Sequence, residues 1–467
     1  MLSPVRPPGF VLPPVNICRR SFQTAAASFP QWKSSPWRSF PNLRAFPRVP
    51  SLSTTPNPQK GGPGNNGPSK GNGSPDFGEG ELFASSPELE QLAMKSSDAP
   101  ILTRIVSYNV LSSSLAGASH FPNCDPENLK ASARLKRLLI KLEGPVASRS
   151  IICLQEVSLA WSGPLHTFFA TRGFHLMLAS HGSYFNGYMG EGLAFPLDLY
   201  EAVDLHIERL TDFMNWPQAP KPVGVAGLLS EIRTRIVKAM QALVGFSKPS
   251  RYAKREPWAH ARGRHNRFIF ARLRSRTNGA KICVGTYHMP CIFWSPSVML
   301  IHCALVVSRF QKLCGDDYGV LAGDFNIKPT DESYAMILRG TVDETHEDYP
   351  PRAPDGSPAS SWFPKPLAPM KSAYREVLGD EPDFTNYAKV ENQPVFIETL
   401  DYMFCTKDVD VVDVIRLAKR EAVQGPYPDA TEPSDHVMIG ATLRLPAPSR
   451  VVRKGVSVGS SAYQDGT

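Results

Sequence analysis

The sequence predicts an α/β domain over residues 99–446, and three observations lead to this prediction. Short runs rich in β-branched and other apolar residues alternate with segments of helical period. Polar side chains follow where several of these runs end. The chain of 467 residues has 44 prolines and 34 glycines, and much of their excess lies before residue 76. The folded part is therefore expected to begin near Ala99.

Six strands and two helices can be placed in this domain. The strands are expected at 101–108, 150–154, 280–287, 318–322, 398–404 and 437–445. One helix is expected at 129–142, with leucines on one face and Lys and Arg on the other, and Gly144-Pro145 is expected to end it. The second helix is expected at 298–313. Strand–helix–strand order occurs twice, which is the α/β pattern.

Polar residues at the strand ends are expected to converge on one site, because strand ends of an α/β fold meet at one edge. Carboxylate and amide oxygens are hard ligands that suit Mg2+. Two histidines and the remaining carboxylates can transfer protons, so the set suits hydrolysis of a phosphate ester by metal-activated water. Each residue alone has an ordinary structural explanation as a cap or a hydrogen-bonded side chain, but the set as a whole does not. Its members are Asn109, Glu156, His288, Asp324, Asn326, Asp401, Asp435 and His436.

Six motifs in chain order resemble one protein superfamily. They are Tyr108-Asn109, Leu154-Gln155-Glu156, Thr286-Tyr287-His288, Gly323-Asp324-Phe325-Asn326, Leu400-Asp401-Tyr402 and Ser434-Asp435-His436. Over about residues 100–446 the chain resembles the endonuclease/exonuclease/phosphatase superfamily, which includes abasic-site endonucleases, deadenylases, inositol-polyphosphate 5-phosphatases and neutral sphingomyelinases. The resemblance implies a four-layer α/β sandwich, two packed mixed β-sheets flanked by helices, with one site at the sheet edges.

The resemblance also implies a metal site. Glu156 matches the main Mg2+ ligand of the superfamily, and Mn2+ is an alternative ion. Asn109 and Asp435 match residues that assist it.

The remaining motif residues are expected to act on the substrate. Asp324 matches the group that orients or deprotonates the attacking water, and Asn326 matches the residue that positions Asp324 and the phosphate. His436 matches a donor to a non-bridging phosphate oxygen, with Asp401 orienting its ring. His288 matches a second phosphate donor.

Two further segments, 383–387 and 398–402, resemble the branch that contains deadenylases, nocturnin and 2′,5′-phosphodiesterases. Asn386 in the first segment is a candidate substrate contact. Met289-Pro290-Cys291 departs from the Asn-Thr-His-Leu pattern that is usual around His288 in that branch. We expect a monomeric, Mg2+-dependent phosphodiesterase that hydrolyses RNA or an oligonucleotide. The alternatives are a phosphatase or lipid phosphodiesterase (inositol-phosphate or sphingomyelin type) and a non-catalytic RNA-binding module.

A basic insert is expected at 212–265. An apolar stripe at helical spacing from Val225 to Leu243 predicts a surface helix packed on the body, and the alternative is a helix on a membrane surface. Ten Lys and Arg with interleaved aromatics follow over 247–276. They indicate either RNA contacts or a solvated loop whose charge balances the acidic segment 343–355, which is part of a long surface loop expected at 343–371. The candidate RNA contacts are Arg262, Arg264 and Arg267.

The ends of the chain differ in composition from its centre. The first acidic residue is Asp76, and removing the nine basic residues before it leaves 42 Lys and Arg against 43 Asp and Glu. Residues 1–54 resemble a mitochondrial transit peptide, with a plastid address or an untargeted, cytoplasmic tail as alternatives. Residues 55–98 are expected to be a disordered linker, and 447–467 a disordered tail. No uncharged run of 18 or more apolar residues suggests a membrane span.

Overall fold

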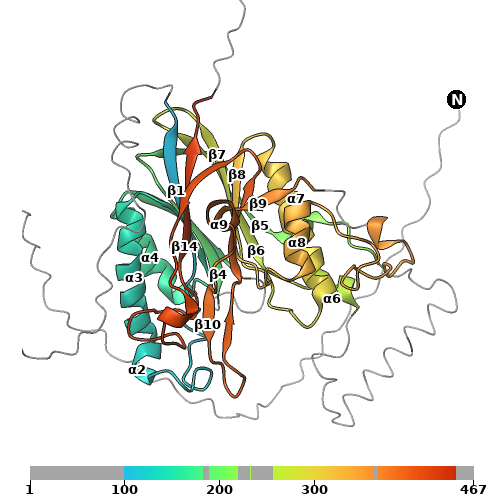
Figure 1. Cartoon of the computed structure of the whole chain (residues 1–467), viewed down its shortest axis with the longest axis horizontal. Coiled ribbons are helices and arrows are strands. Elements are labelled where there is room, and N and C mark those ends of the chain that lie inside the picture. The colour runs from blue at the N-terminus through green and yellow to red at the C-terminus, as the bar shows by residue number, and fades with distance from the viewer. Residues whose placement is uncertain (1–98, 182–188, 219–231, 233–255, 362–366, 449–467) are drawn as a thin grey trace, which may run out of the picture. The chain divides into compact units, whose positions relative to one another are not determined.

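The computed structural model describes residues 99–181, 189–218, 232, 256–361 and 367–448. The chain divides into two units, residues 1–75 and 76–467, and every described residue belongs to the second. In this unit two six-stranded sheets pack face to face, and helices cover their outer faces (Figure 1). The predicted four-layer sandwich is confirmed.

The first sheet has the strand order β13-β14-β1-β2-β4-β3. The central strands β1 and β2 are parallel, and every other pair in this sheet is antiparallel. The strands are β1 (Ile101–Asn109), β2 (Ile151–Gln155), β3 (Phe174–Ser180), β4 (Gly190–Pro196), β13 (Asp410–Val414) and β14 (Ile439–Leu445).

The second sheet has the order β5-β6-β7-β8-β12-β9, and β7 with β8 is its parallel pair. Strands β10 (Asn386–Ala388) and β11 (Phe396–Glu398) form a separate hairpin, which lies between β9 and β12 in the chain. The strands of the second sheet are β5 (Tyr200–Arg209), β6 (Arg267–Ser275), β7 (Lys281–Tyr287), β8 (Tyr318–Asp324), β9 (Met370–Ser372) and β12 (Asp401–Thr406).

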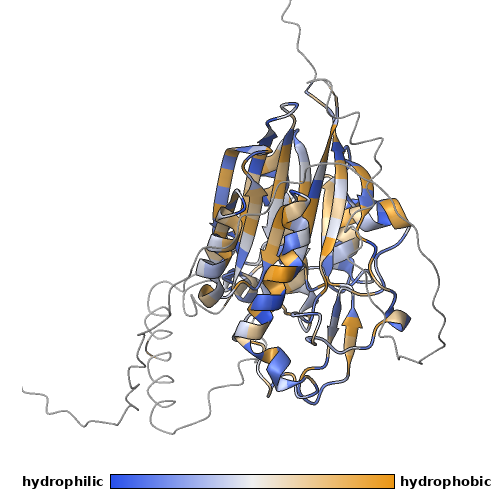
Figure 2. Cartoon of the chain, turned by 90° about the vertical axis from the view of Figure 1, so that its left-hand side faces the viewer, coloured by the Kyte–Doolittle hydropathy of each residue, from blue (hydrophilic) through white to orange (hydrophobic). Residues whose placement is uncertain are grey.

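Alternation along the strands builds the layers. On β6, Phe268 and Phe270 pack toward the outer helices, whereas Ile269 and Ala271 belong to the core between the sheets. Figure 2 shows that hydrophobic residues concentrate along the strands. Burial of these alternating faces on both sides of each sheet explains why the strands are so apolar.

Helices α3 (Ala131–Ala147) and α4 (Leu159–Ala170) cover the first sheet, and α7 (Pro296–Cys314) and α8 (Glu332–Arg339) cover the second. By length and composition α7 is able to cross a membrane, but 61% of its apolar window is buried in the fold. It therefore has the character of a core helix. The smaller helices are α2 (Pro126–Leu129), α6 (Pro257–Arg262), α9 (Ala373–Leu378), η1 (Leu210–Phe213), η2 (Ala359–Ser361) and η3 (Arg420–Ala422).

Two predicted boundaries were wrong. Gly144-Pro145 does not end the first helix, which continues to Ala147. Pro145 lies in its last turn, where the missing N–H removes one helical hydrogen bond. Burial of Pro145 and Val146 against the first sheet offsets this loss. The predicted strand 398–404 is split, because the chain turns at 399–400 from the hairpin into β12.

Several predictions lie outside the described residues. They concern the leader (1–54), the linker (55–98), the tail beyond residue 448 and the apolar stripe of the insert. Within the described part of the predicted loop 343–371, the structure has only η2 and the start of β9.

Candidate active site

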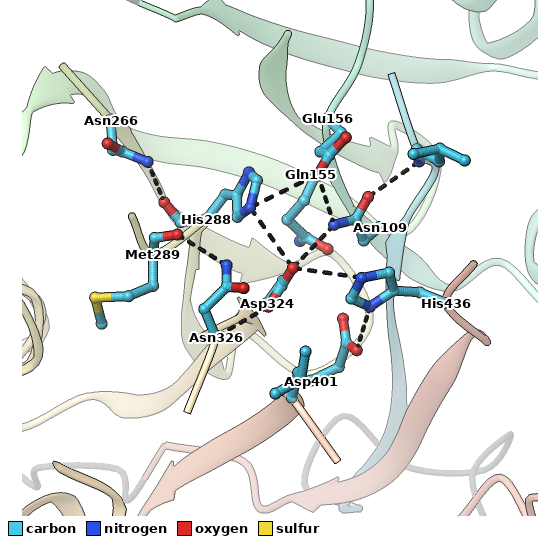
Figure 3. Close-up of polar contacts among 12 residues, drawn as sticks. Asn109, Gln155, Glu156, Asn266, His288, Met289, Asp324, Asn326, Asp401 and His436 are labelled. Carbon is cyan, nitrogen blue, oxygen red and sulfur yellow. Dashed lines mark hydrogen bonds and ion pairs between the residues drawn. The ribbon is translucent and has the colours of Figure 1, made fainter. Parts of the chain in front are cut away.

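Seven of the predicted site residues meet at one edge of the two sheets: Asn109, Glu156, His288, Asp324, Asn326, Asp401 and His436 (Figure 3). The parallel strands β1 and β2 end at Asn109 and Gln155, and the parallel strands β7 and β8 end at Tyr287 and Asp324. Strand β12 runs antiparallel to β8, so that Asp401 at its start lies opposite Asp324. The packing of two sheets with central parallel pairs therefore brings distant motifs to one place.

Asp324 is at the centre of this group and is 1% exposed. Its Oδ2 accepts a hydrogen bond from Asn109 Nδ2 at 2.9 Å. The same oxygen lies 3.5 Å from His288 Nε2 and 3.7 Å from His436 Nε2. Its Oδ1 accepts the backbone N–H of Asn326 at 2.9 Å. One carboxylate therefore faces two histidines and is oriented by two amides.

His436 forms a buried pair with Asp401. Its Nδ1 lies 2.7 Å from Asp401 Oδ2. Thr385 Oγ1 donates to the same oxygen at 2.6 Å and accepts the backbone N–H groups of Leu400 (2.9 Å) and Asp401 (3.0 Å). Burial alone would lower the pKa of His436, but the carboxylates of Asp401 and Asp324 raise it well above its ordinary value. The His436 ring is therefore held as a cation at neutral pH.

Glu156 follows β2 and is held from two sides. Ser112 donates its backbone N–H to Oε2 at 2.9 Å, and Asn109 Nδ2 lies 3.3 Å from Oε1. His288 Nε2 is 3.8 Å from Oε1. Burial raises the pKa of Asp435, the charge of His436 acts against this, and the charge of Glu156 raises the pKa further.

The site contains the oxygen donors that a divalent metal requires. Ligand atoms of Asp324, Asp401 and His436 lie within 4.8 Å of one another. Asp401 Oδ1 is buried without a hydrogen-bond partner among the described residues. In this group of three, Asp401 and His436 already contact each other. Glu156 and Asp435, by contrast, offer only carboxylate oxygens.

Asn109 points its amide nitrogen toward the carboxylates of Glu156 and Asp324. Its Oδ1 accepts the backbone N–H of Leu111 at 3.0 Å, so Nδ2 faces Glu156 and Asp324. Asn326 Nδ2 donates to the carbonyl of Met289 at 3.0 Å. Both amides link neighbouring strand ends.

The backbone of the site takes unusual conformations. A Cβ on Gly323 would lie 2.0 Å from the carbonyl oxygen of Tyr287, so only glycine fits before Asp324. Glu156 and Asn326 have φ values of 60° and 50°. Non-glycine residues rarely adopt these values, and such strain clusters at functional sites.

Two of the predicted RNA contacts lie near the catalytic group. Arg267 Nε donates to the carbonyl of Ser180 at 3.3 Å, and Arg264 contacts the ring of His260. Burial lowers the pKa of His181 to about 4, and His288, His265, Arg267 and Arg264 lower it further. The ring of His181 is therefore neutral at neutral pH, and the positive charge beside it comes from Arg264 and Arg267. These two arginines are called the basic edge below.

The other two predicted substrate contacts differ in their surroundings. Arg262 is exposed in the last turn of α6. Asn386 is 4% exposed and forms an isolated β-bridge with His436. The structure thus places Asn386 next to the catalytic histidine and Arg262 on the surface.

Some residues that contact or follow the predicted site residues were not found from the sequence. Thr385 orients Asp401, and Asn266 Nδ2 donates to the carbonyl of His288 at 2.8 Å. Phe293 and Trp294 are 71% and 50% exposed in the loop that follows His288, with ring centroids 5.2 Å apart. Aromatic residues shortly after a strand-end histidine were the available signal for this pair.

Comparison with known proteins agrees with this geometry. The model of the Endonuclease/Exonuclease/phosphatase family matches residues 106–436, from β1 to His436. The chain belongs to this family. The match spans every motif named above, so the chain has the fold and the site of a phosphoric ester hydrolase.

Individual relatives point to the branch that was predicted. The chain is 24% identical over 412 residues to human 2′,5′-phosphodiesterase 12, which covers 79% of this chain and 58% of the relative. It is 27% identical over 223 residues to the CCR4-Not complex 3′-5′-exoribonuclease subunit Ccr4 of Phaeosphaeria nodorum, covering 37% and 35%. The chain thus spans little more than half of the human relative.

A solved structure shares the fold. The crystal structure of ANGEL2, a 2′,3′-cyclic phosphatase, aligns with a TM-score of 0.52 over 74% of this chain and 96% of that one, at 16% identity.

Proposed function

We propose that this protein is a Mg2+-dependent phosphodiesterase that hydrolyses RNA or an oligonucleotide with an activated water molecule. The observation that carries the proposal is Asp324, a buried carboxylate between His288 and His436, with His436 kept cationic by Asp401. Such a group provides a base and two phosphate donors within one small site.

The residues of the chain have separate tasks in this proposal. Asp324 orients the water and accepts its proton, because Oδ2 faces the site while Oδ1 is held by Asn326. His436 donates through Nε2 to a non-bridging phosphate oxygen, since its Nδ1 is engaged by Asp401. His288 donates to the same charged phosphate from the other side. Removing one such donor typically costs about 10²–10³ in rate.

Glu156 and Asp435 would hold the metal ion, with Asn109 orienting Glu156 from the side. Bound Mg2+ would supply positive charge that stabilises the phosphate in the transition state. Mn2+ is expected to substitute, because it also accepts carboxylate ligands.

Two surface features favour a nucleic acid as the substrate. Phe293 and Trp294 expose aromatic faces in the loop that follows His288, and stacking on such faces holds unpaired bases. The basic edge lies on the side of His288 and can contact flanking phosphates. The printed activities of 2′,5′-phosphodiesterase 12 and the 3′-5′-exoribonuclease Ccr4 support the same substrate class.

A substrate panel tests this proposal. Poly(A), 2′,5′-oligoadenylate, NADPH, inositol phosphates and sphingomyelin would each be incubated with Mg2+ and the full chain, with Asp324→Asn as the matched inactive control. Turnover of an oligonucleotide alone is the expected result. Turnover of inositol phosphates or sphingomyelin would instead establish a phosphatase or lipid phosphodiesterase. RNA binding without turnover of any substrate would establish a binding module.

A further inference from the structure

Helix α3 carries a buried arginine that reaches the catalytic loops. Arg134 is 0% exposed. Its Nε donates to the carbonyl of Pro433 at 2.6 Å. Its Nη2 donates to the carbonyls of Val110 at 2.7 Å and Leu111 at 2.5 Å. One guanidinium group therefore satisfies three backbone oxygens from two loops.

These two loops supply residues on both sides of the site. Val110 directly follows Asn109, and Pro433 directly precedes Ser434. Ser434 Oγ donates to the carbonyl of Asn109 at 2.6 Å and accepts the backbone N–H of His436 at 3.2 Å. Arg134 thus links two segments. One is the strand end at Asn109, which orients Glu156, and the other is the loop that carries Asp435 and His436.

A second cation on the same helix holds the same loop. Lys141 lies seven residues after Arg134 and therefore on the same face of α3. It forms an ion pair with Glu432, whose carboxylate also accepts the hydroxyl of Tyr108. Glu432 is 6% exposed and directly precedes Pro433. The loop is therefore anchored at two adjacent residues by one helix face.

The guanidinium of Arg134 remains charged inside the fold. Its Nη1 is buried without a hydrogen-bond partner among the described residues. Burial lowers the pKa of Arg134 to about 10, with the carboxylates of Asp435 and Glu156 acting in the opposite direction. The group therefore remains cationic at neutral pH.

We propose that Arg134, assisted by Lys141, is a positioning residue that sets the spacing between the Asn109 strand end and the loop carrying Asp435 and His436. This inference rests on the proposed function, because its consequence is the alignment of metal ligands with the catalytic histidine. Its rival is that Arg134 only fixes α3 to the fold, where its guanidinium also lies 5.2 Å from the ring of Trp161.

The test compares two arginines of α3. Arg134→Lys keeps the charge but cannot reach three carbonyls at once. Arg137→Lys is the matched control, because Arg137 bonds to Asn128 Oδ1 and its carbonyl at 2.8 and 2.6 Å, outside the site. Both variants would be assayed for kcat per folded molecule, KM and the Mg2+ concentration for half-maximal activity.

Arg134→Lys is expected to lower kcat or raise the required Mg2+ by about 10–100-fold with KM little changed, as for other residues that orient metal ligands. Arg137→Lys is expected to leave these values unchanged. Amide hydrogen exchange in EDTA gives a readout without metal: the peptide 429–437 should exchange faster in Arg134→Lys only. Equal loss of thermal stability in both variants, with wild-type kcat, Mg2+ dependence and exchange, would overturn the inference.

A second variant covers the case in which Arg134→Lys does not fold. Lys141→Met combined with Glu432→Gln removes the ion pair without leaving a lone buried charge. It is expected to lower kcat and to accelerate exchange in 429–437, and unchanged values of both would contradict the inference. If the wild-type protein cleaves no substrate, the proposed function fails, whereas the exchange experiment still decides whether this helix face orders the loop.

Discussion

Thr385 offers the sharpest test of how the site is held together. Its hydroxyl donates to Asp401 Oδ2 at 2.6 Å and accepts two backbone N–H groups, those of Leu400 and Asp401. Thr385→Val keeps the shape of this buried side chain and removes only the oxygen. A hydrogen bond to a charged group contributes about 1.5–3 kcal/mol, and each buried N–H left without an acceptor costs about 1–3 kcal/mol. The lower limits of these three contributions add to about 3.5 kcal/mol, and we expect the free energy of unfolding to fall by at least this amount.

Activity should fall as well, because Asp401 loses the group that fixes it against His436. A tenfold loss of kcat corresponds to about 1.4 kcal/mol of lost transition-state stabilisation, and we expect at least this loss. Denaturant titration measures the stability, and initial rates on a phosphodiester substrate at saturating Mg2+ measure kcat. Thr385→Ser retains the hydroxyl and is the matched control. If the valine and serine variants are equally stable and equally active, the hydrogen bonds of Thr385 do not hold the catalytic pair.

Two further predictions follow from the geometry. The raised pKa of His436 means that its protonation stabilises the fold fully below its unfolded pKa of about 6.5, and this contribution is lost as pH rises through the folded pKa. In EDTA, the stability difference between wild type and His436→Asn should therefore shrink from pH 7 to pH 10, whereas a constant difference would refute the charged state. Replacing Phe293 and Trp294 by alanine should raise KM for an oligonucleotide, because each stacked base contributes about 1–3 kcal/mol to binding. The KM for a small diester without bases should not change. An equal effect on both substrates would argue against stacking.

Local patterns predicted the parallel central strands, because buried strands and their polar ends can be recognised in the sequence, whereas the four layers were implied by the family resemblance. β1, β2, β7 and β8 each combine an apolar run with a polar residue at or just after its end, such as Asp324 on β8. The motif order was sufficient to identify the family, and the family match confirms it. Among the described residues, those that contact the Asp324 carboxylate, Asn109, Asn326, His288 and His436, were all predicted.

The missing parts depend on tertiary contacts that leave no periodic signal. Arg134 belongs to a helix whose Lys and Arg were assigned to the face opposite the leucines, yet it is 0% exposed because backbone carbonyls of two loops satisfy it. Strands β3, β4, β5 and β6 were not predicted. β5 is largely exposed, but β4 and β6 are almost wholly buried, so partial burial does not explain why they were missed. Thr385 acquires its role only because the chain turns at 399–400, which brings Asp401 to its hydroxyl.

The identity of Asp324 as the group that activates water is the central claim. A single-turnover assay of an RNA phosphodiester with Mg2+ tests it most directly, with wild type and Asp324→Asn compared at equal folded concentration. Asparagine keeps the size of the side chain but cannot accept a proton, so we predict loss of cleavage by at least about 10²-fold, the lower end of the contribution expected of a general base, with an intact fold. Cleavage by the variant at the wild-type rate would contradict the account.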